Sequence, residues 1–312
     1  MNNQAISAPF LSILMRTQGK RYEALKEALL SLEAQSDGDF EVIVILHRAQ
    51  KADRQGTQAL LEALSPEMKR RLTWRALETG TRSSPLNLAL SLARGEYVAM
   101  LDDDDIVFEN WVENFHRGAQ KHPGAVIRSY GMTQYWNANP VGDALWLEAA
   151  EAPEPTYCAP FDLQKQLTDN YTPISCMAVP RACYSEQGIA FDETLTTAED
   201  WDFMMRCALS CGLYDSGKIT FLYRLWKNAE TSHTVHQNDE WLKNRETILK
   251  KLEKSHQTAT ESGSWQYYGE DAVATAIPKR SFGKRLHNAI RTHGLLGFPV
   301  VVVRKIWYRL FG

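Results

Sequence analysis

The chain has 312 residues, of which 44% are hydrophobic and 23% are charged, and its formal net charge is −3. This composition is typical of a soluble globular protein with one large or two small α/β domains. The small net charge argues against a dedicated nucleic-acid-binding protein, and no apolar run has the length of a transmembrane helix.

The first hundred residues alternate between strand and helix patterns. Four short apolar runs have the character of buried parallel strands. These runs are residues 10–15, 41–46, 72–77 and 97–101. Residues 22–35 have apolar side chains at helical spacing, and a second helix is expected from Ser84, its predicted N-cap, to Gly95. This βαβ rhythm predicts an α/β protein with a mainly parallel sheet, in which ligands bind beyond the carboxyl ends of the strands.

Four consecutive acids, Asp102 to Asp105, follow the strand at 97–101. Like charges repel one another, so this cluster costs stability unless a ligand offsets the charge. Carboxylates hold Mg²⁺ or Mn²⁺ together with substrate phosphates, and a D-x-D spacing can offer a second carboxylate to a ribose hydroxyl. The alternative is that Asp105 or a neighbour caps a helix at 109–121, which accounts for one acid and not for four.

A second acidic feature is the pair Glu199 and Asp200, at the start of a helix that is expected to end at Gly212. Acids in a first helical turn are favoured by the helix dipole, so dipole complementation is the plainest interpretation of the pair. With the four acids earlier in the chain, the pair also suits a general base that works beside a metal site. We expect the dipole to keep Asp200 ionised, at some loss of basicity.

The order of these segments resembles the family 2 glycosyltransferases, which have the nucleotide-binding fold called GT-A. The similarity covers about residues 9–250 and rests on four segments. They are FLSILMRT with its helix and EVIVIL; GTRSSPLNLALSLARGEYVAMLDDDD; NYTPISCMAVPRACYSEQGIAFDETLTTAEDWDF; and FLYRLWKNAETS. The resemblance implies a GT-A domain with a Rossmann-like sheet over residues 1–254. Its nucleotide-binding half would be about 9–124 and its acceptor-side half about 125–254.

The resemblance further implies transfer of a sugar from a nucleotide diphosphate sugar to an acceptor hydroxyl, usually with inversion. Asp104 would bind a Mg or Mn divalent cation, Asp102 would lie at the metal or the ribose, and Asp103 in the nucleotide-sugar site. Asp200 would be the general base, with Glu199 beside it. Such a cation stabilises the charge of the leaving diphosphate, and inversion needs a single base on the opposite face.

Four more residues are candidates for the site. Arg16 and Thr17 end the first strand and Arg82 precedes a helix, so each is placed to contact a nucleotide sugar. An exposed strand end or a solvated loop residue would have the same appearance. Trp201 adjoins the proposed base and is a candidate acceptor-side sugar platform, although tryptophan is more often part of a core.

The sequence departs from the family at three places. Leu46 and His47 stand where an acid commonly meets the base or ribose, and Leu86 replaces a common arginine. The histidine that often follows the closing strand is missing there, and His233 lies further on. These changes leave the identity of the nucleotide open.

Three segments lie outside the motifs. We expect a loop-rich acceptor-side insertion at 135–161, a polar linker at 255–276 and a basic, apolar tail at 277–312. After Asp271 the chain has no acid and eight basic residues. They are Lys279, Arg280, Lys284, Arg285, Arg291, Arg304, Lys305 and Arg309. The part of the tail at 279–312 suits an anionic membrane surface, and the alternative is a helix packed on the catalytic domain. Membrane binding would fit a lipid-linked or other glycan acceptor, as in bacterial surface glycan synthesis.

The five cysteines are odd in number and have no zinc-ligand spacing, which favours free thiols in a reducing compartment. The N-terminus has no signal-peptide pattern, so we expect a cytoplasmic protein, peripheral at the inner face of the membrane if the tail binds there.

Two other functions stay open at this stage. A nucleotidyltransferase could use the same acids for Mg²⁺, but it needs a glycine-rich phosphate loop that the sequence does not show. A catalytically silent relative that binds a glycan or a partner enzyme would not need Asp102, Asp104 and Asp200, whereas the changed turn at Leu46 fits such a protein.

Overall fold

The computed structural model describes residues 8–141, 144–228 and 238–269. The strands in these ranges are β1 (Leu11–Thr17), β2 (Phe40–His47), β3 (Leu72–Leu77), β4 (Tyr97–Met100), β5 (Ile106–Val107), β6 (Val126–Val141), β7 (Ala144–Ala149), β8 (Glu154–Tyr157), β9 (Met177–Pro180), β10 (Leu213–Trp226) and β11 (Tyr267–Gly269). The helices are α1 (Tyr22–Glu33), α2 (Lys51–Ala63), α3 (Pro66–Arg71), α4 (Ser84–Leu92), α5 (Trp111–Lys121), α6 (Leu163–Gln166), α7 (Ala182–Ser185), α8 (Glu199–Cys211) and α10 (Asn238–Ser262), with a 3₁₀ turn η1 (Ile174–Cys176).

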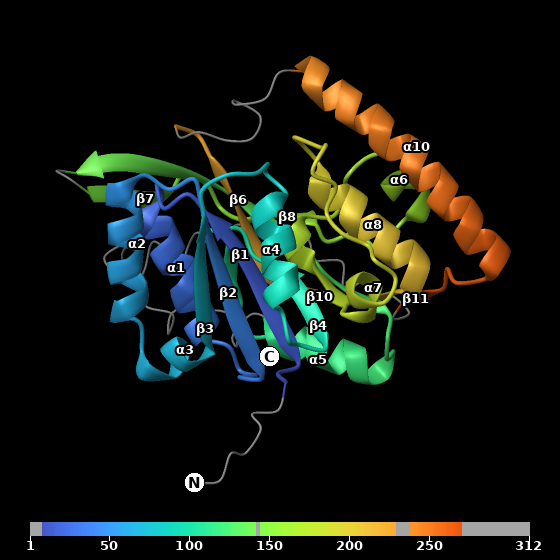
Figure 1. The fold of residues 1–312 in the computed structure, drawn as a ribbon, viewed down its shortest axis with the longest axis horizontal. Helices are drawn as coiled ribbons and strands as arrows, with labels where there is room; N and C mark the ends of the chain where they lie inside the picture. Colours follow the sequence, from blue (N-terminus) through green and yellow to red (C-terminus); the bar gives the residue numbers. More distant parts are fainter. Residues whose placement is uncertain (1–7, 142–143, 229–237, 270–312) are drawn as a thin grey trace, which may run out of the picture.

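One twisted sheet organises the described residues, with helices on both faces (Figure 1). Its main path runs in the order β11-β10-β6-β9-β4-β1-β2-β3. Strands β4, β1, β2 and β3 are parallel, and so are β6, β10 and β11. Strand β9 is antiparallel to both β4 and β6 and joins the two parallel groups. The prediction of a mainly parallel sheet flanked by helices is confirmed.

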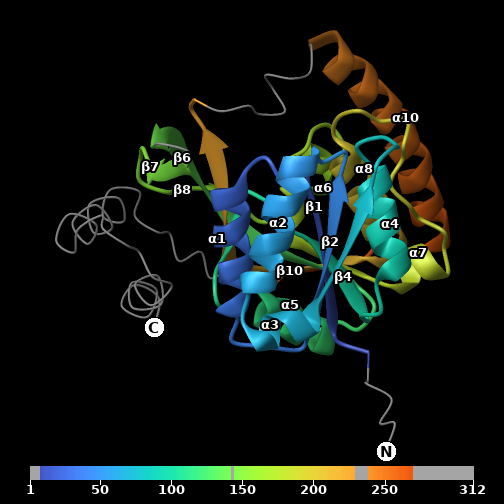
Figure 2. The same ribbon diagram turned by 60° about the vertical axis from the view of Figure 1, so that its left-hand side comes forward.

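Alternation along β1 shows how the sheet separates two cores. Leu11, Ile13 and Met15 are buried in the core shared with α1, α2 and α5, whereas Leu14 points into the core shared with α4, α8 and α10. Successive side chains of a strand lie on opposite faces, so an apolar strand of this kind needs helices on both sides. Figures 1 and 2 show α1 and α2 on one side of the sheet and α4, α8 and α10 on the other.

The predicted elements of the first hundred residues match β1, α1, β2, β3, α4 and β4, with shifts of a few residues at their ends. The N-cap of α4 is Ser83 rather than Ser84. Gly95 is required by close packing, because a Cβ atom there would lie 2.6 Å from the backbone nitrogen of Ser12.

The prediction of a loop-rich insertion at 135–161 is wrong. The end of β6 pairs with β7 from Trp136 opposite Ala149 to Val141 opposite Ala144, and β8 also pairs with β6. Backbone pairing to an existing long strand stabilises this hairpin, even though acids and Pro140 blur the alternation in the sequence.

The predicted linker at 255–276 also differs from the structure over its described part. Helix α10 continues to Ser262, and β11 then pairs with β10 at the edge of the sheet. Leu252 and Ala259 of α10 are buried in the core that contains α8, and this packing holds a helix whose sequence is mostly polar. The rest of that linker and the tail at 277–312 lie outside the described residues.

All five cysteines are free thiols, as expected; Cys176, Cys183 and Cys207 are buried, and Cys158 and Cys211 are partly buried. In the part of the chain that the structure describes, no helix combines the length and apolar character that crossing a membrane requires.

Candidate functional site

The carboxyl ends of β1 and β4 bring the first group of predicted residues together. These strands are parallel neighbours, with Leu14 opposite Met100, so Arg16 and Thr17 lie beside the acids that follow β4. The Thr17 hydroxyl donates a hydrogen bond to the carboxylate of Asp103. Thr17 and Asp103 therefore lie together at the carboxyl ends of the parallel strands, as the sequence predicts.

Glu199 also lies at these carboxyl ends, although it is far away in the sequence. Its Oε1 atom accepts hydrogen bonds from Arg16 Nη1 and from Arg82 Nε, each at 2.7 Å. Arg16 also donates to the backbone carbonyl of Arg82 at 3.0 Å. Burial raises the pKa of Glu199, but the charges of the two arginines outweigh it and lower the pKa to about 2.

Arg16 is the residue around which the predicted carboxylates gather. Burial lowers its pKa, but the negative charges of Glu199, Asp102 and Asp200 outweigh this and raise the pKa above its ordinary value. Arg16 contacts Glu199 directly, and its attraction to Asp102 and Asp200 indicates that these carboxylates lie nearby. The D-x-D acids and the start of α8 thus form one candidate site.

Asp200 has the properties of a proton acceptor near neutral pH. Burial, followed by the charge of Glu199, raises its pKa to about 6. The side-chain nitrogen of Asn170 lies 3.5 Å from its Oδ2 atom. The expectation that Asp200 is less basic than an ordinary aspartate is wrong, because burial and the charge of Glu199 outweigh the backbone hydrogen bond of Trp201 and the charge of Arg82. Ala198, the N-cap of α8, has a left-handed backbone with φ of 55°, and this strained turn precedes the acidic pair.

The four acids after β4 have different environments. Asp105 is 1% exposed and accepts a hydrogen bond at 2.9 Å from the backbone nitrogen of Arg224. The N-cap of α5 is Asn110, so Asp105 does not cap that helix. Burial raises the pKa of Asp103 to about 7, with Asp104 as the next cause. Burial also raises the pKa of Asp102, against the attraction of Arg16.

Asp102 and Asp104 have the donor chemistry that a hard divalent cation requires. Their mutual repulsion contributes to the raised pKa of Asp102, and a bound cation would relieve it. Among the residues that the structure describes, no group of three or more His, Cys, Asp or Glu side chains could hold a metal ion. A cation at this pair would therefore need further ligands, such as the phosphate oxygens of a substrate.

Three residues of the site were not predicted from the sequence. Arg21 forms an ion pair with Asp104, and Trp226 Nε1 donates to the same carboxylate oxygen at 2.8 Å. Arg224 donates from Nε to the backbone carbonyl of Asp104. The segment FLYRLWKN contributed to the family resemblance, and its arginine and tryptophan, two residues apart on one strand face, were the available signal.

Trp201 does not have its predicted role. It is 2% exposed, lies in the core with Phe203 and Met204, and donates from Nε1 to the carbonyl of Gln166 at 2.8 Å. A buried indole cannot stack on a sugar. The residue next to Asp200 faces inward because the apolar side of α8 packs on the sheet.

His47 ends β2 as a mostly buried side chain, and its Nε2 atom lies 3.3 Å from the carbonyl oxygen of Thr79. Burial lowers its pKa, so the ring is neutral at pH 7.

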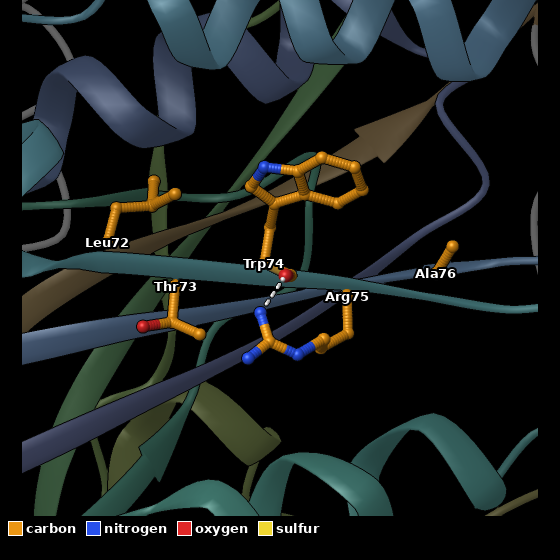
Figure 3. Close-up of a pocket in the computed structure, with 5 residues that line it drawn as sticks. All are labelled: Leu72, Thr73, Trp74, Arg75 and Ala76. Atoms are coloured by element: carbon orange, nitrogen blue, oxygen red, sulfur yellow. Dashed lines mark hydrogen bonds between the residues drawn. The ribbon is translucent and has the colours of Figure 1, made fainter.

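A surface hollow of about 610 Å³ lies on the edge strand β3, lined by Leu72 to Ala76 (Figure 3). The side chains of Trp74 and Arg75 point to opposite sides of this strand, and none of the predicted site residues lines the hollow.

Comparison with known proteins assigns the family. The family model described as "Glycosyl transferase family 2" matches residues 12–171, which is about half of the chain. The chain belongs to glycosyl transferase family 2. The match spans β1, the D-x-D segment and the hairpin, and it confirms the resemblance seen in the sequence.

One relative in sequence also bears a glycosyltransferase name. The "Uncharacterized glycosyltransferase MJ1057" of Methanocaldococcus jannaschii is 28% identical over 105 residues, or 34% of this chain. The matching segment covers about a third of that relative's length, 35%.

Solved structures share the fold. The structure of S. aureus TarS 1-349 in complex with UDP-GlcNAc has a TM-score of 0.54 and 19% identity, covering 80% of this chain and 72% of that chain. The structure of TarS 1-349 without a named ligand has a TM-score of 0.51 and 20% identity, covering 81% and 73%. Such low identity supports the fold alone, and the GT-A arrangement is confirmed at that level.

Proposed function

We propose that the protein is an inverting glycosyltransferase that moves a sugar from a nucleotide diphosphate sugar to a hydroxyl group of an acceptor. The observation that supports this most strongly is the arrangement around Arg16, where Asp102, Glu199 and Asp200 gather at one edge of the sheet. An acid cluster for a diphosphate-bound cation then lies beside a carboxylate of raised pKa. This combination suits inverting transfer, in which one base activates the acceptor and a cation stabilises the leaving diphosphate.

In this mechanism Asp200 takes the proton of the acceptor hydroxyl as the new glycosidic bond forms. Its pKa of about 6 leaves it mostly ionised at pH 7 and gives it more basicity than an ordinary aspartate. Glu199 stays ionised and holds Arg16 and Arg82 in place, so it acts as a positioning residue.

Asp102 and Asp104 would hold a Mg²⁺ or Mn²⁺ ion, which would stabilise the charge of the leaving nucleoside diphosphate. Thr17, Asp103 and Arg82 would line the donor side of the same edge. The structural neighbour TarS binds UDP-GlcNAc, which supports a nucleotide sugar as the donor class.

The acceptor is proposed to be a glycan or a lipid-linked saccharide in surface polysaccharide synthesis. The basic tail at 279–312 would then bring the enzyme to an anionic membrane surface from the cytoplasmic side. A hydroxyl acceptor of this class agrees with a single carboxylate base.

Melting temperatures test the donor site. We would measure them with a panel of nucleoside diphosphates and nucleotide sugars, with and without Mn²⁺, for the wild type, Asp104→Ala and the control Asp39→Ala. Asp39 is exposed just before β2, at the amino ends of the strands. A ligand at a hundred times its Kd adds about 2.7 kcal/mol. We expect a rise of roughly 5 °C with one nucleotide, dependent on Mn²⁺, kept in Asp39→Ala and lost in Asp104→Ala. No rise with any nucleotide would favour a silent relative.

A further inference from the structure

The carboxylate of Asp104 is held by two donors that come from different elements. Arg21, the N-cap residue of α1, forms an ion pair with its Oδ2 atom, and Trp226 at the end of β10 donates to the same atom from Nε1 at 2.8 Å. The side chain of Asp104 is 13% exposed and that of Arg21 is 34% exposed. The carboxylate to which the proposed function assigns a cation is thus already paired with a positive charge of the protein.

Arg224 holds the surroundings of this carboxylate in place. Its guanidinium is buried, donates to the carbonyl of Ala24 at 3.3 Å, and stacks over Trp136 and Trp226 at 5.2 and 5.5 Å from the ring centroids. Its Nε atom donates to the carbonyl of Asp104. The side chain of Arg21 is one third exposed, so breaking its ion pair with Asp104 costs less free energy than breaking the buried contacts of Arg224.

Charge explains why an arginine lies there. Asp102, Asp103 and Asp104 are consecutive acids, with Thr17 bonded to Asp103 and Arg21 paired with Asp104. Arg21 therefore supplies a positive charge beside this acidic cluster. A guanidinium binds carboxylates and phosphates with the same geometry, so a diphosphate offers Arg21 an alternative anion.

We propose that Arg21 is an internal counter-ion that occupies Asp104 until a diphosphate draws it away, so that the divalent cation and the diphosphate enter the site together. This inference rests on the proposed function. It gives Arg21 two opposing effects: it competes with a bare cation for Asp104, and it helps to bind a diphosphate. If Arg21 only stabilised the fold, its substitution would weaken the binding of both the cation and the diphosphate, or of neither.

Two binary titrations separate these cases. Binding of Mn²⁺ alone is followed from the electron paramagnetic resonance signal of the free ion, and binding of inorganic pyrophosphate alone is followed by calorimetry in EDTA. The proteins are the wild type, Arg21→Gln, Arg21→Lys, Asp104→Asn and the control Arg48→Gln. Arg48 is an exposed arginine after β2 that donates to the carbonyl of Gly80, so its variant removes one charge at the same edge of the sheet without touching Asp104.

We expect Arg21→Gln to bind Mn²⁺ about fivefold more tightly and pyrophosphate about fivefold more weakly, with Arg21→Lys in between and Arg48→Gln unchanged. If Arg21→Gln leaves Mn²⁺ affinity unchanged while Asp104→Asn abolishes it, the cation site stands and the role of Arg21 is refuted. A loss of both affinities in Arg21→Gln refutes it as well. If no variant binds Mn²⁺ even with pyrophosphate present, the inference and the cation of the proposed function fail together.

Discussion

Arg16 and Glu199 are separated by 183 residues, and their side chains meet at 2.7 Å at the edge of the sheet. This ion pair joins the end of β1 to the start of α8, and Arg82 adds a second cation to the same oxygen. The contact connects the amino-terminal part of the sheet to the helix that carries the proposed base.

Glu199→Gln is expected to destabilise the fold in a pH-dependent way. The pKa of Glu199 falls from 4.5 to about 2 on folding, so its stabilisation is complete above pH 4.5 and is lost as the pH falls toward 2. The effect at pH 7 is on the order of 3 kcal/mol. Urea unfolding at pH 7 and at pH 3 measures it, with the exposed Glu67→Gln as control. A difference between variant and wild type that is as large at pH 3 as at pH 7 would refute this account.

The rate of transfer should depend on the ionisation of Asp200. Because its pKa is raised to about 6, kcat/KM is expected to rise tenfold per pH unit below pH 6 and to level off above it. Release of nucleoside diphosphate, measured between pH 5 and 8, gives this profile. An acid limb near pH 4 would mean that another group, or an unperturbed aspartate, is the base.

The buried pair Arg128 and Asp215 is a test of stability away from the site. Both side chains are 3% exposed, and Asp215 accepts two hydrogen bonds from Arg128 Nη1, at 3.0 and 3.1 Å, and one from the Phe161 backbone. Arg128→Met leaves a buried carboxylate without its cation and is expected to cost about 3–5 kcal/mol in urea unfolding.

The matched control for this variant is Arg75→Met, on the exposed edge strand β3, which should change stability by less than about 0.5 kcal/mol. An equal effect of the two substitutions would show that the β6–β10 pair is not a stabilising contact.

Local patterns were sufficient to predict the parallel strands β1, β2, β3 and β4. Strand β2 is buried along its whole length, and its apolar, β-branched sequence has one plausible structure. Strand β11 could not be predicted because its partner β10 is distant in the sequence. The hairpin β6–β7 was missed because acids and Pro140 blur the alternation of its sequence. Propensity alone does not determine such edge elements.

The site was predictable where charge marks it and not where packing determines it. Asp102 to Asp105 stand out as acids at the end of an apolar run, and Glu199 and Asp200 as acids at the start of a helix. The burial of Trp201 depends on which face of α8 meets the sheet. The contact of Arg21 with Asp104 depends on the path of the loop after β1, and no spacing in the sequence encodes it.

The most direct test of the account compares the wild type with Asp200→Asn, in donor binding by calorimetry and in transfer by release of nucleoside diphosphate. We predict unchanged donor affinity and a loss of transfer of about 10²–10⁴-fold. The variant should melt no lower than the wild type at pH 7, because a raised folded-state pKa means that ionised Asp200 destabilises the fold above pH 6. Undiminished transfer by a folded Asp200→Asn protein would contradict the central claim that Asp200 is the base.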